Sequence, residues 1–146
     1  AARLAALKLL NRRDYGAREL GERLAERGFA TATAQAVVDQ LVREKLLDDS
    51  RFAEHFVAYH ANRGQGPVRI AHKLREAGVA AELISASVDA GSADWRRRCA
   101  EVRRKRFGAR EPGSWAERGK QARFLTQRGF SSDQVRAAVG RDLDGE

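Results

Sequence analysis

One short pattern recurs three times along the chain at nearly constant spacing. A leucine, three variable residues, a glycine and an apolar residue occur at Leu24–Phe29, Leu74–Val79 and Leu125–Phe130. The glycines of these patterns lie 50 and then 51 residues apart (78−28 and 129−78). A period of this size is typical of arrays in which one small supersecondary unit is repeated. The sequence therefore predicts three copies of a single unit.

Each copy has the periodicity of short helices. Apolar residues recur at three- and four-residue steps, and each glycine supplies the left-handed residue that ends a helix. We expect an all-α chain, a tandem array of three three-helix repeats over 1–47, 48–91 and 92–146. In the first copy, Thr31 or Thr33 is expected to cap the third helix. The expected apolar faces there are Leu4, Ala6, Leu7 and Leu10, and then Ala34, Val37, Val38, Leu41 and Val42.

The central copy has the best-defined helix boundaries. The run of Asp48, Asp49 and Ser50 can accept hydrogen bonds from the first free amides of a helix. A Gly66-Pro67 junction predicts a second start, with proline at the first helical position. Between them, aromatic residues follow at i, i+4 and i+7, and we expect them in the core rather than as an exposed base-stacking platform. These residues are Phe52, Phe56 and Tyr59.

Charge is concentrated near the C-terminal end. The chain has a net charge of +8, and residues 92–146 contribute +6 of it, with fourteen Lys/Arg against eight Asp/Glu (14 − 8). Such an excess favours a polyanionic partner, nucleic acid or an acidic protein groove, over a merely solvated basic surface. The densest strip lies on one face of a predicted helix, where Glu101 is expected to pair with Lys105. Its members are Arg97, Arg98, Arg104 and Lys105.

Motifs for catalysis and for cofactors are missing. The chain has no phosphate-binding loop and no HExxH pattern, so we expect neither an enzyme nor a metal or cofactor. Cys99 falls on an apolar helical stripe and is expected to be a small core residue. The last helix of the central copy, near 80–89, has no side chain suited to reading bases in the major groove. No apolar run is long enough for a membrane helix, and a single cysteine suits a cytoplasmic location.

Several motifs occur in the order found in one known family. They are Arg13-x-Tyr15, Glu19-Leu20-x-x-x-Leu24-x-x-x-Gly28-Phe29, Leu47-Asp48-Asp49-x-Arg51-Phe52-Ala53, Gly66-Pro67-x-Arg69-Ile70, Leu74-x-x-x-Gly78-Val79 and Phe124-Leu125-x-x-Arg128-Gly129-Phe130. Together they resemble the bacterial RecX regulators of the RecA recombinase, over nearly the whole chain. The chain departs from the family pattern at Lys73, where an acidic residue is frequent, and at Gly16, where a capping serine is frequent.

The resemblance implies a fold and a function. Family members are elongated, curved arrays of three three-helix repeats that lodge in the helical groove of the RecA–DNA filament. They suppress its ATPase, strand-exchange and co-protease activities, in homologous recombination, DNA repair and the SOS response. We accordingly expect a monomeric, non-enzymatic regulator whose partners are the RecA nucleoprotein filament and single- or double-stranded DNA.

Two other functions stay open. One is an autonomous DNA-binding protein without sequence specificity, and the other is a helical scaffold for a different protein. For all three functions, the cations expected to contact the partner or DNA are Arg51, Arg63, Arg69, Lys73, Arg97, Arg98, Arg104 and Lys105.

Overall fold

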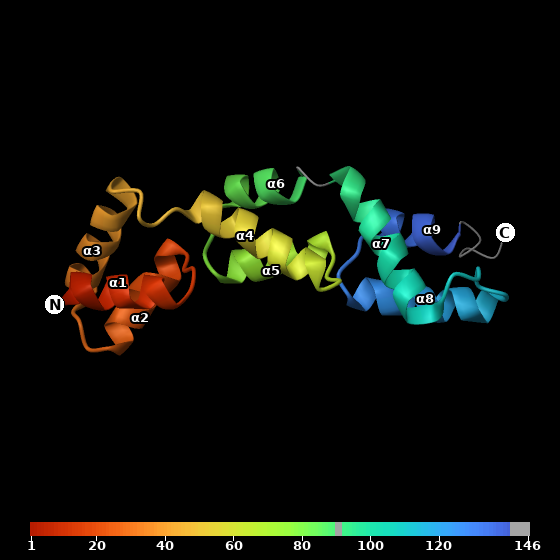
Figure 1. The fold of residues 1–146 in the computed structure, drawn as a ribbon, viewed down its shortest axis with the longest axis horizontal. Helices are drawn as coiled ribbons and strands as arrows, with labels where there is room; N and C mark the ends of the chain where they lie inside the picture. The colour runs from red at the N-terminus through yellow and green to blue at the C-terminus, as the bar shows by residue number, and fades with distance from the viewer. Residues whose placement is uncertain (90–91, 141–146) are drawn as a thin grey trace.

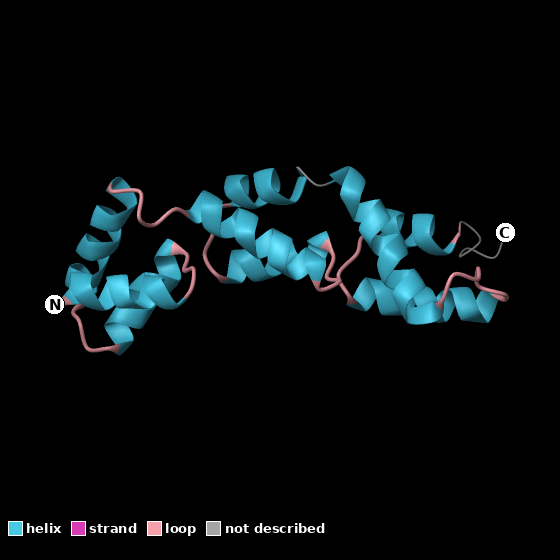
Figure 2. Ribbon diagram, in the orientation of Figure 1, coloured by secondary structure: helices cyan, strands magenta, loops and turns pink. Residues whose placement is uncertain are grey.

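The computed structural model describes residues 1–89 and 92–140, and every regular element in these ranges is an α-helix (Figure 2). The helices are α1 (Ala2–Arg12), α2 (Ala17–Glu26), α3 (Thr31–Arg43), α4 (Asp49–Asn62), α5 (Pro67–Glu76), α6 (Ala81–Asp89), α7 (Ser92–Phe107), α8 (Trp115–Gln127) and α9 (Ser132–Val139). Figure 1 shows them in three groups of three along one elongated row, with the groups of α1–α3 and α7–α9 at opposite ends. The prediction of an all-α array of three three-helix repeats is confirmed. None of the described helices is long and apolar enough to cross a membrane.

Side-chain caps set several of the helix starts. Asp48 accepts hydrogen bonds from the main-chain N–H groups of Ser50 and Arg51, as predicted for α4. Gly66 and Pro67 hold the predicted N-cap and first position of α5. Ser114 caps α8 by accepting from the N–H of Glu117 at 3.0 Å.

The cap predicted for the third helix is wrong. Thr31 is the first residue of α3, its N-cap is Ala30, and no side chain caps this end. The N-cap position at the end of the turn after α2 is taken by Ala30, so both Thr31 and Thr33 lie inside the helix.

The apolar core is divided into two clusters. One belongs to the first repeat and includes Leu20, Leu24 and Leu41. The other is continuous through the second and third repeats, from Phe52 to Val139. The second and third repeats are therefore one packed body, whereas the first repeat has a core of its own.

Three residues predicted for apolar faces are exposed. Leu4 is 58% exposed because α1 buries Ala2, Ala6 and Leu9, which lie on the opposite side of the helix. Val42, near the end of α3, lies at the flank of its buried face and is also exposed. Tyr59 is 55% exposed, while Phe52 is buried and Phe56 is partly buried against the core.

The second and third repeats meet end to end through their main chains. The N–H of Gly66, at the start of α5, donates to the carbonyl oxygen of Arg128 at 2.8 Å, just beyond the end of α8. The N–H of Val68 donates to the carbonyl oxygen of Gly129 at 2.9 Å. A Cβ on Gly66 would lie 2.4 Å from the carbonyl carbon of Gly129, and one on Gly129 would lie 2.3 Å from the Cβ of Arg69. Glycine is required on both sides of this contact.

The second repeat docks on the first as the third docks on the second, with the end of its middle helix at the start of the preceding middle helix. Here, however, the contacts are made by side chains. Gly78, just beyond the end of α5, lies against Arg18 at the start of α2, where an added Cβ would be 2.2 Å from the Arg18 Cδ. The first free amide of α2, at Ala17, donates to Oδ1 of Asp49 at 2.8 Å. Among the described residues, no main-chain hydrogen bond joins these two repeats. The recurring glycine thus ends a helix and also lets that end approach the preceding repeat.

We expect Gly129→Ala to destabilise the body of the second and third repeats more than Gly108→Ala does. Both glycines have positive φ, +100° and +89°, but only the Cβ at 129 would meet a neighbour within 4 Å. Left-handed strain costs roughly 1–2 kcal/mol in each case, and overpacking adds about 1–3 kcal/mol at 129. Denaturant unfolding of the two variants measures the difference. Equal losses would mean that the junction tolerates a side chain.

Candidate functional site

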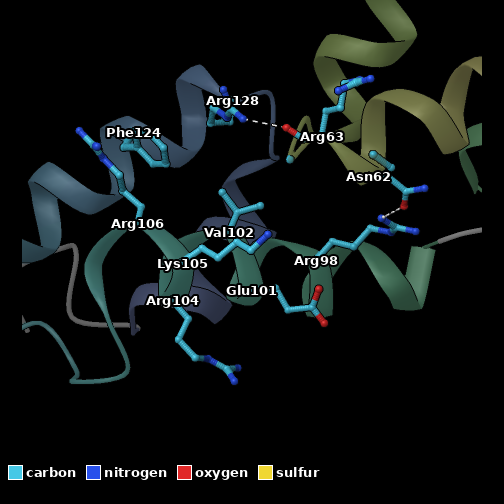
Figure 3. A pocket seen from close by; sticks show the side chains of 12 residues that line it. Asn62, Arg63, Arg98, Glu101, Val102, Arg104, Lys105, Arg106, Phe124 and Arg128 are labelled. Atoms are coloured by element: carbon cyan, nitrogen blue, oxygen red, sulfur yellow. Dashed lines mark hydrogen bonds between the residues drawn. The ribbon is translucent and has the colours of Figure 1, made fainter.

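A groove of about 1000 Å³ lies where the end of α4 meets α7 and α8 (Figure 3). It spans the boundary between the second and third repeats, so neither repeat contains it alone. Its lining residues are Ala61, Asn62, Arg63, Gly64, Arg98, Glu101, Val102, Arg104, Lys105, Arg106, Phe124 and Arg128.

The groove is strongly basic. Six of its lining residues are cations, and its one carboxylate, Glu101, is already bonded to Arg97 at 3.0 Å. The helices α4, α7 and α8 all end near the groove, and the C-terminal end of a helix carries a partial negative charge that cations stabilise. Part of the basic charge therefore stabilises the protein itself.

Two arginines of the third repeat hold the groove in shape. Arg98 donates from Nη1 to Oδ1 of Asn62 at 3.1 Å, and Arg128 donates from Nη2 to the carbonyl oxygen of Arg63 at 2.9 Å (Figure 3). Both bonds cross to the end of α4. Since the main-chain junction at Gly66 lies beside them, the walls of the groove are fixed relative to each other.

Two other cations in the groove have side chains that no acceptor of the described chain occupies, so these side chains are available to a ligand. Within the described part of the chain, the side chains of Lys105 and Arg104 have no hydrogen-bond or ion-pair partner. Figure 3 shows Lys105 directed across the groove past Val102, whereas Arg104 points away from the other cations. The expected pairing of Glu101 with Lys105 is wrong, because Glu101 bonds to Arg97 instead. That choice leaves the ammonium group of Lys105 unpaired inside the groove.

Phe124 closes one end of the groove. The guanidinium carbon of Arg106 lies 5.3 Å from the centre of its ring, and that of Arg128 lies 5.9 Å away. The Phe107 ring packs edge-on against Phe124 at 5.4 Å. Phe124 is therefore flanked by two cations of the groove and by the Phe107 ring.

The structure brings together four of the eight cations singled out from the sequence: Arg63, Arg98, Arg104 and Lys105 line the groove. Arg97 lies on the same helix but outside the groove, and its bonds to Asp94 and Glu101 raise its pKa.

The other three predicted cations lie elsewhere. Arg69 donates to the carbonyl oxygen of Gln127 at 3.2 Å, within the junction between the second and third repeats. Lys73 donates to Oε1 of Gln65 at 3.2 Å, and Arg51 lies at the start of α4, beside the first repeat. A role for any of these residues in binding stays a prediction.

Sequence reasoning left two groove cations out of the candidate site. Arg106 continues the basic strip of α7, and Arg128 belongs to the recurring pattern at the end of α8. Their spacing in the sequence gives no sign that they meet, because α7 and α8 bring them to the same Phe124 ring only in the folded chain. Arg103 was also missed: it is buried and donates to Oε1 of Gln121 at 3.3 Å. It supports the third repeat rather than the groove.

The single cysteine lies in the core, and the described residues contain no metal-binding cluster. Cys99 is fully buried, and burial raises the pKa of its thiol to about 12, so it is a core residue as expected. No group of three or more His, Cys, Asp or Glu side chains in the described ranges could hold a metal ion. His60 packs on the Phe56 ring at 4.2 Å beside the groove.

We expect the protein to lose stability as pH falls from 7.5 to 5.5, in part through His60. Burial, with the charges of Lys73 and Arg63, lowers the pKa of His60. The unfolded chain therefore takes up a proton near the usual histidine pKa of about 6.5, before the folded chain does, and unfolding is favoured. His60→Gln removes this contribution, so its free energy of unfolding should fall less steeply over the same range. Parallel pH curves for the two proteins would contradict the assignment.

Comparison with known proteins gives matches along the whole chain. Family models for the first, second and third three-helix domains of RecX match residues 2–41, 48–87 and 96–139. A regulatory protein RecX of Halorhodospira halophila is 48% identical over 147 aligned positions, covering 100% of this chain and 91% of the relative. One of Pseudomonas fluorescens is 38% identical and covers 99% and 94%. The crystal structure of RecX from Lactobacillus salivarius shares the fold, with a TM-score of 0.83 and 18% identity over 99% of this chain and 96% of that one.

Proposed function

The chain belongs to the RecX family of regulatory proteins, and from this premise we propose that it binds the RecA–DNA filament in its helical groove. Bound there, it inhibits the ATPase, strand-exchange and co-protease activities of RecA. The observation that carries the proposal is the match of all three RecX three-helix domains, in order, to this chain.

The shape of the molecule supports binding to a polymer. Three repeats in a row present several surfaces along one direction (Figure 1), and a filament presents the same surface many times. When one repeat is bound, the next contact is made at high effective concentration, so weak contacts add to a strong one. The rigid body of the second and third repeats would carry the main contact, because it contains the basic groove.

The predicted cations divide between two kinds of contact in this proposal. Arg63, Arg98, Arg104 and Lys105 line the groove, where the partner is a polyanion, and Arg104 points away from the other three. The other four, which are Arg51, Arg69, Lys73 and Arg97, contact the filament singly or serve the fold.

We expect the chain to lower the single-stranded-DNA-dependent ATP hydrolysis of RecA at substoichiometric ratios. One bound molecule in the filament groove contacts several RecA subunits, so few molecules are enough. The rate of ATP hydrolysis is measured against chain concentration, and binding to the filament is measured in the same buffer. Demonstrated binding with unchanged hydrolysis would rule out the proposed regulation.

A second candidate function is DNA binding without RecA, favoured by the unpaired Lys105 in a groove with six cations. Replacing Arg97, Arg98, Arg104 and Lys105 together with alanine should weaken DNA binding and reduce its dependence on salt. The logarithm of the affinity changes by roughly one unit per decade of salt for each phosphate neutralised. A salt slope equal to that of the wild-type chain would remove this candidate.

A further inference from the structure

An exposed aromatic side chain lies against Arg63, one of the residues that line the basic groove. Tyr59, on α4, is 55% exposed although it continues the aromatic series of Phe52 and Phe56, which pack against the core. The guanidinium carbon of Arg63 lies 4.1 Å from the centre of the Tyr59 ring, and Arg63 also lines the groove. The tyrosine is thus placed beside the groove by the same turn of helix that supplies one of its cations.

The Tyr59 ring packs against two neighbouring side chains of its own chain. The His60 ring packs against it at 5.1 Å with an angle of 83° between the planes, and Arg63 covers it from the end of the helix. The carbonyl oxygen of Arg63 accepts the bond from Arg128, which ties this end of α4 to the third repeat. An aromatic ring held in this way loses little conformational freedom on binding.

We propose that Tyr59 and Arg63 form a base-stacking platform, and that the adjoining groove takes the phosphates of the same strand. The site then selects single-stranded over double-stranded nucleic acid, because only unpaired bases can leave the stack to lie on an aromatic ring or a guanidinium plane. This inference rests on the DNA-binding function proposed above, and it names the form of nucleic acid that the groove binds.

The charge of the groove fits the second half of this site. Lys105 is unpaired, and the only carboxylate in the lining is neutralised by Arg97. An acidic protein segment would be attracted by the same cations, but attraction between charges alone does not involve the exposed aromatic ring beside them. The combination of such a ring with a row of cations is the arrangement by which proteins bind single strands without reading sequence.

The test measures binding of the full chain to a fluorescent oligo-dT and to a duplex of the same length, in the absence of RecA and over a range of salt concentrations. Tyr59→Ala is expected to weaken binding of the single strand roughly tenfold, with an unchanged salt slope and unchanged duplex binding. Tyr59→Phe keeps the ring and is expected to bind as the wild type does. Because the Tyr59 side chain is mostly exposed, both variants retain the core.

Two further variants separate stacking from charge. Lys105→Ala is expected to reduce the single-strand salt slope by about 0.7, the value for one phosphate contact. Lys120→Ala removes an equal charge from an exposed site on α8 outside the groove, and it should leave the slope as it is.

Several results would overturn the inference. They are single-strand binding by Tyr59→Ala equal to wild type, or an equal loss of affinity for single strand and duplex. A third is binding of poly-glutamate by a chain that binds neither oligonucleotide. RecA ATPase inhibition, measured on the same proteins, separates this inference from the filament function. Inhibition without strand selection overturns the platform alone, whereas strand selection without inhibition supports the platform and overturns the filament function.

Discussion

The contact on which the molecule depends is the approach of one helix end to the start of another at Gly66 and Gly129. There the carbonyl groups left free beyond α8 accept hydrogen bonds from the amides left free at the start of α5. The opposite partial charges of the two helix ends face each other, which adds to the attraction. Neither glycine can carry a side chain at this distance. The groove exists because this contact brings the end of α4 against α7 and α8.

Some cations of the groove hold its walls together and others are unpaired, and their positive charge alone does not tell which is which. Arg98 and Arg128 bind oxygen atoms of the neighbouring repeat, and so they hold the walls together. Lys105 has no such task in the described chain, because Glu101 is bonded to Arg97 on the preceding turn. A basic groove built in this way keeps its shape without a ligand, since Arg98 and Arg128 are already bonded to acceptors across the junction.

The repeat, the helical class and the family could be predicted from sequence, because each depends on local patterns. The glycine spacing gives the number of units, and the caps at Asp48 and Gly66 give helix starts. Tyr59 could not be placed, because periodicity shows which residues share a helix face but not where the partner helices stop covering it. The groove could not be predicted for a related reason: Arg63 and Arg128 are brought together by a junction between residues far apart in the chain.

The start of α8 differs from the starts of α2 and α5. In those helices a glycine, Gly16 or Gly66, precedes the first turn, and the following repeat docks against it. α8 has 13 residues where α5 has 10, and Ser114 satisfies its own helix while exposed Trp115 takes the first position. A unit docked here as the following repeats dock on α2 and α5 would meet the side chain of Ser114 and the bulky indole of Trp115 in place of a glycine. The start of α8 therefore lacks the small residue through which the starts of α2 and α5 receive the following repeat.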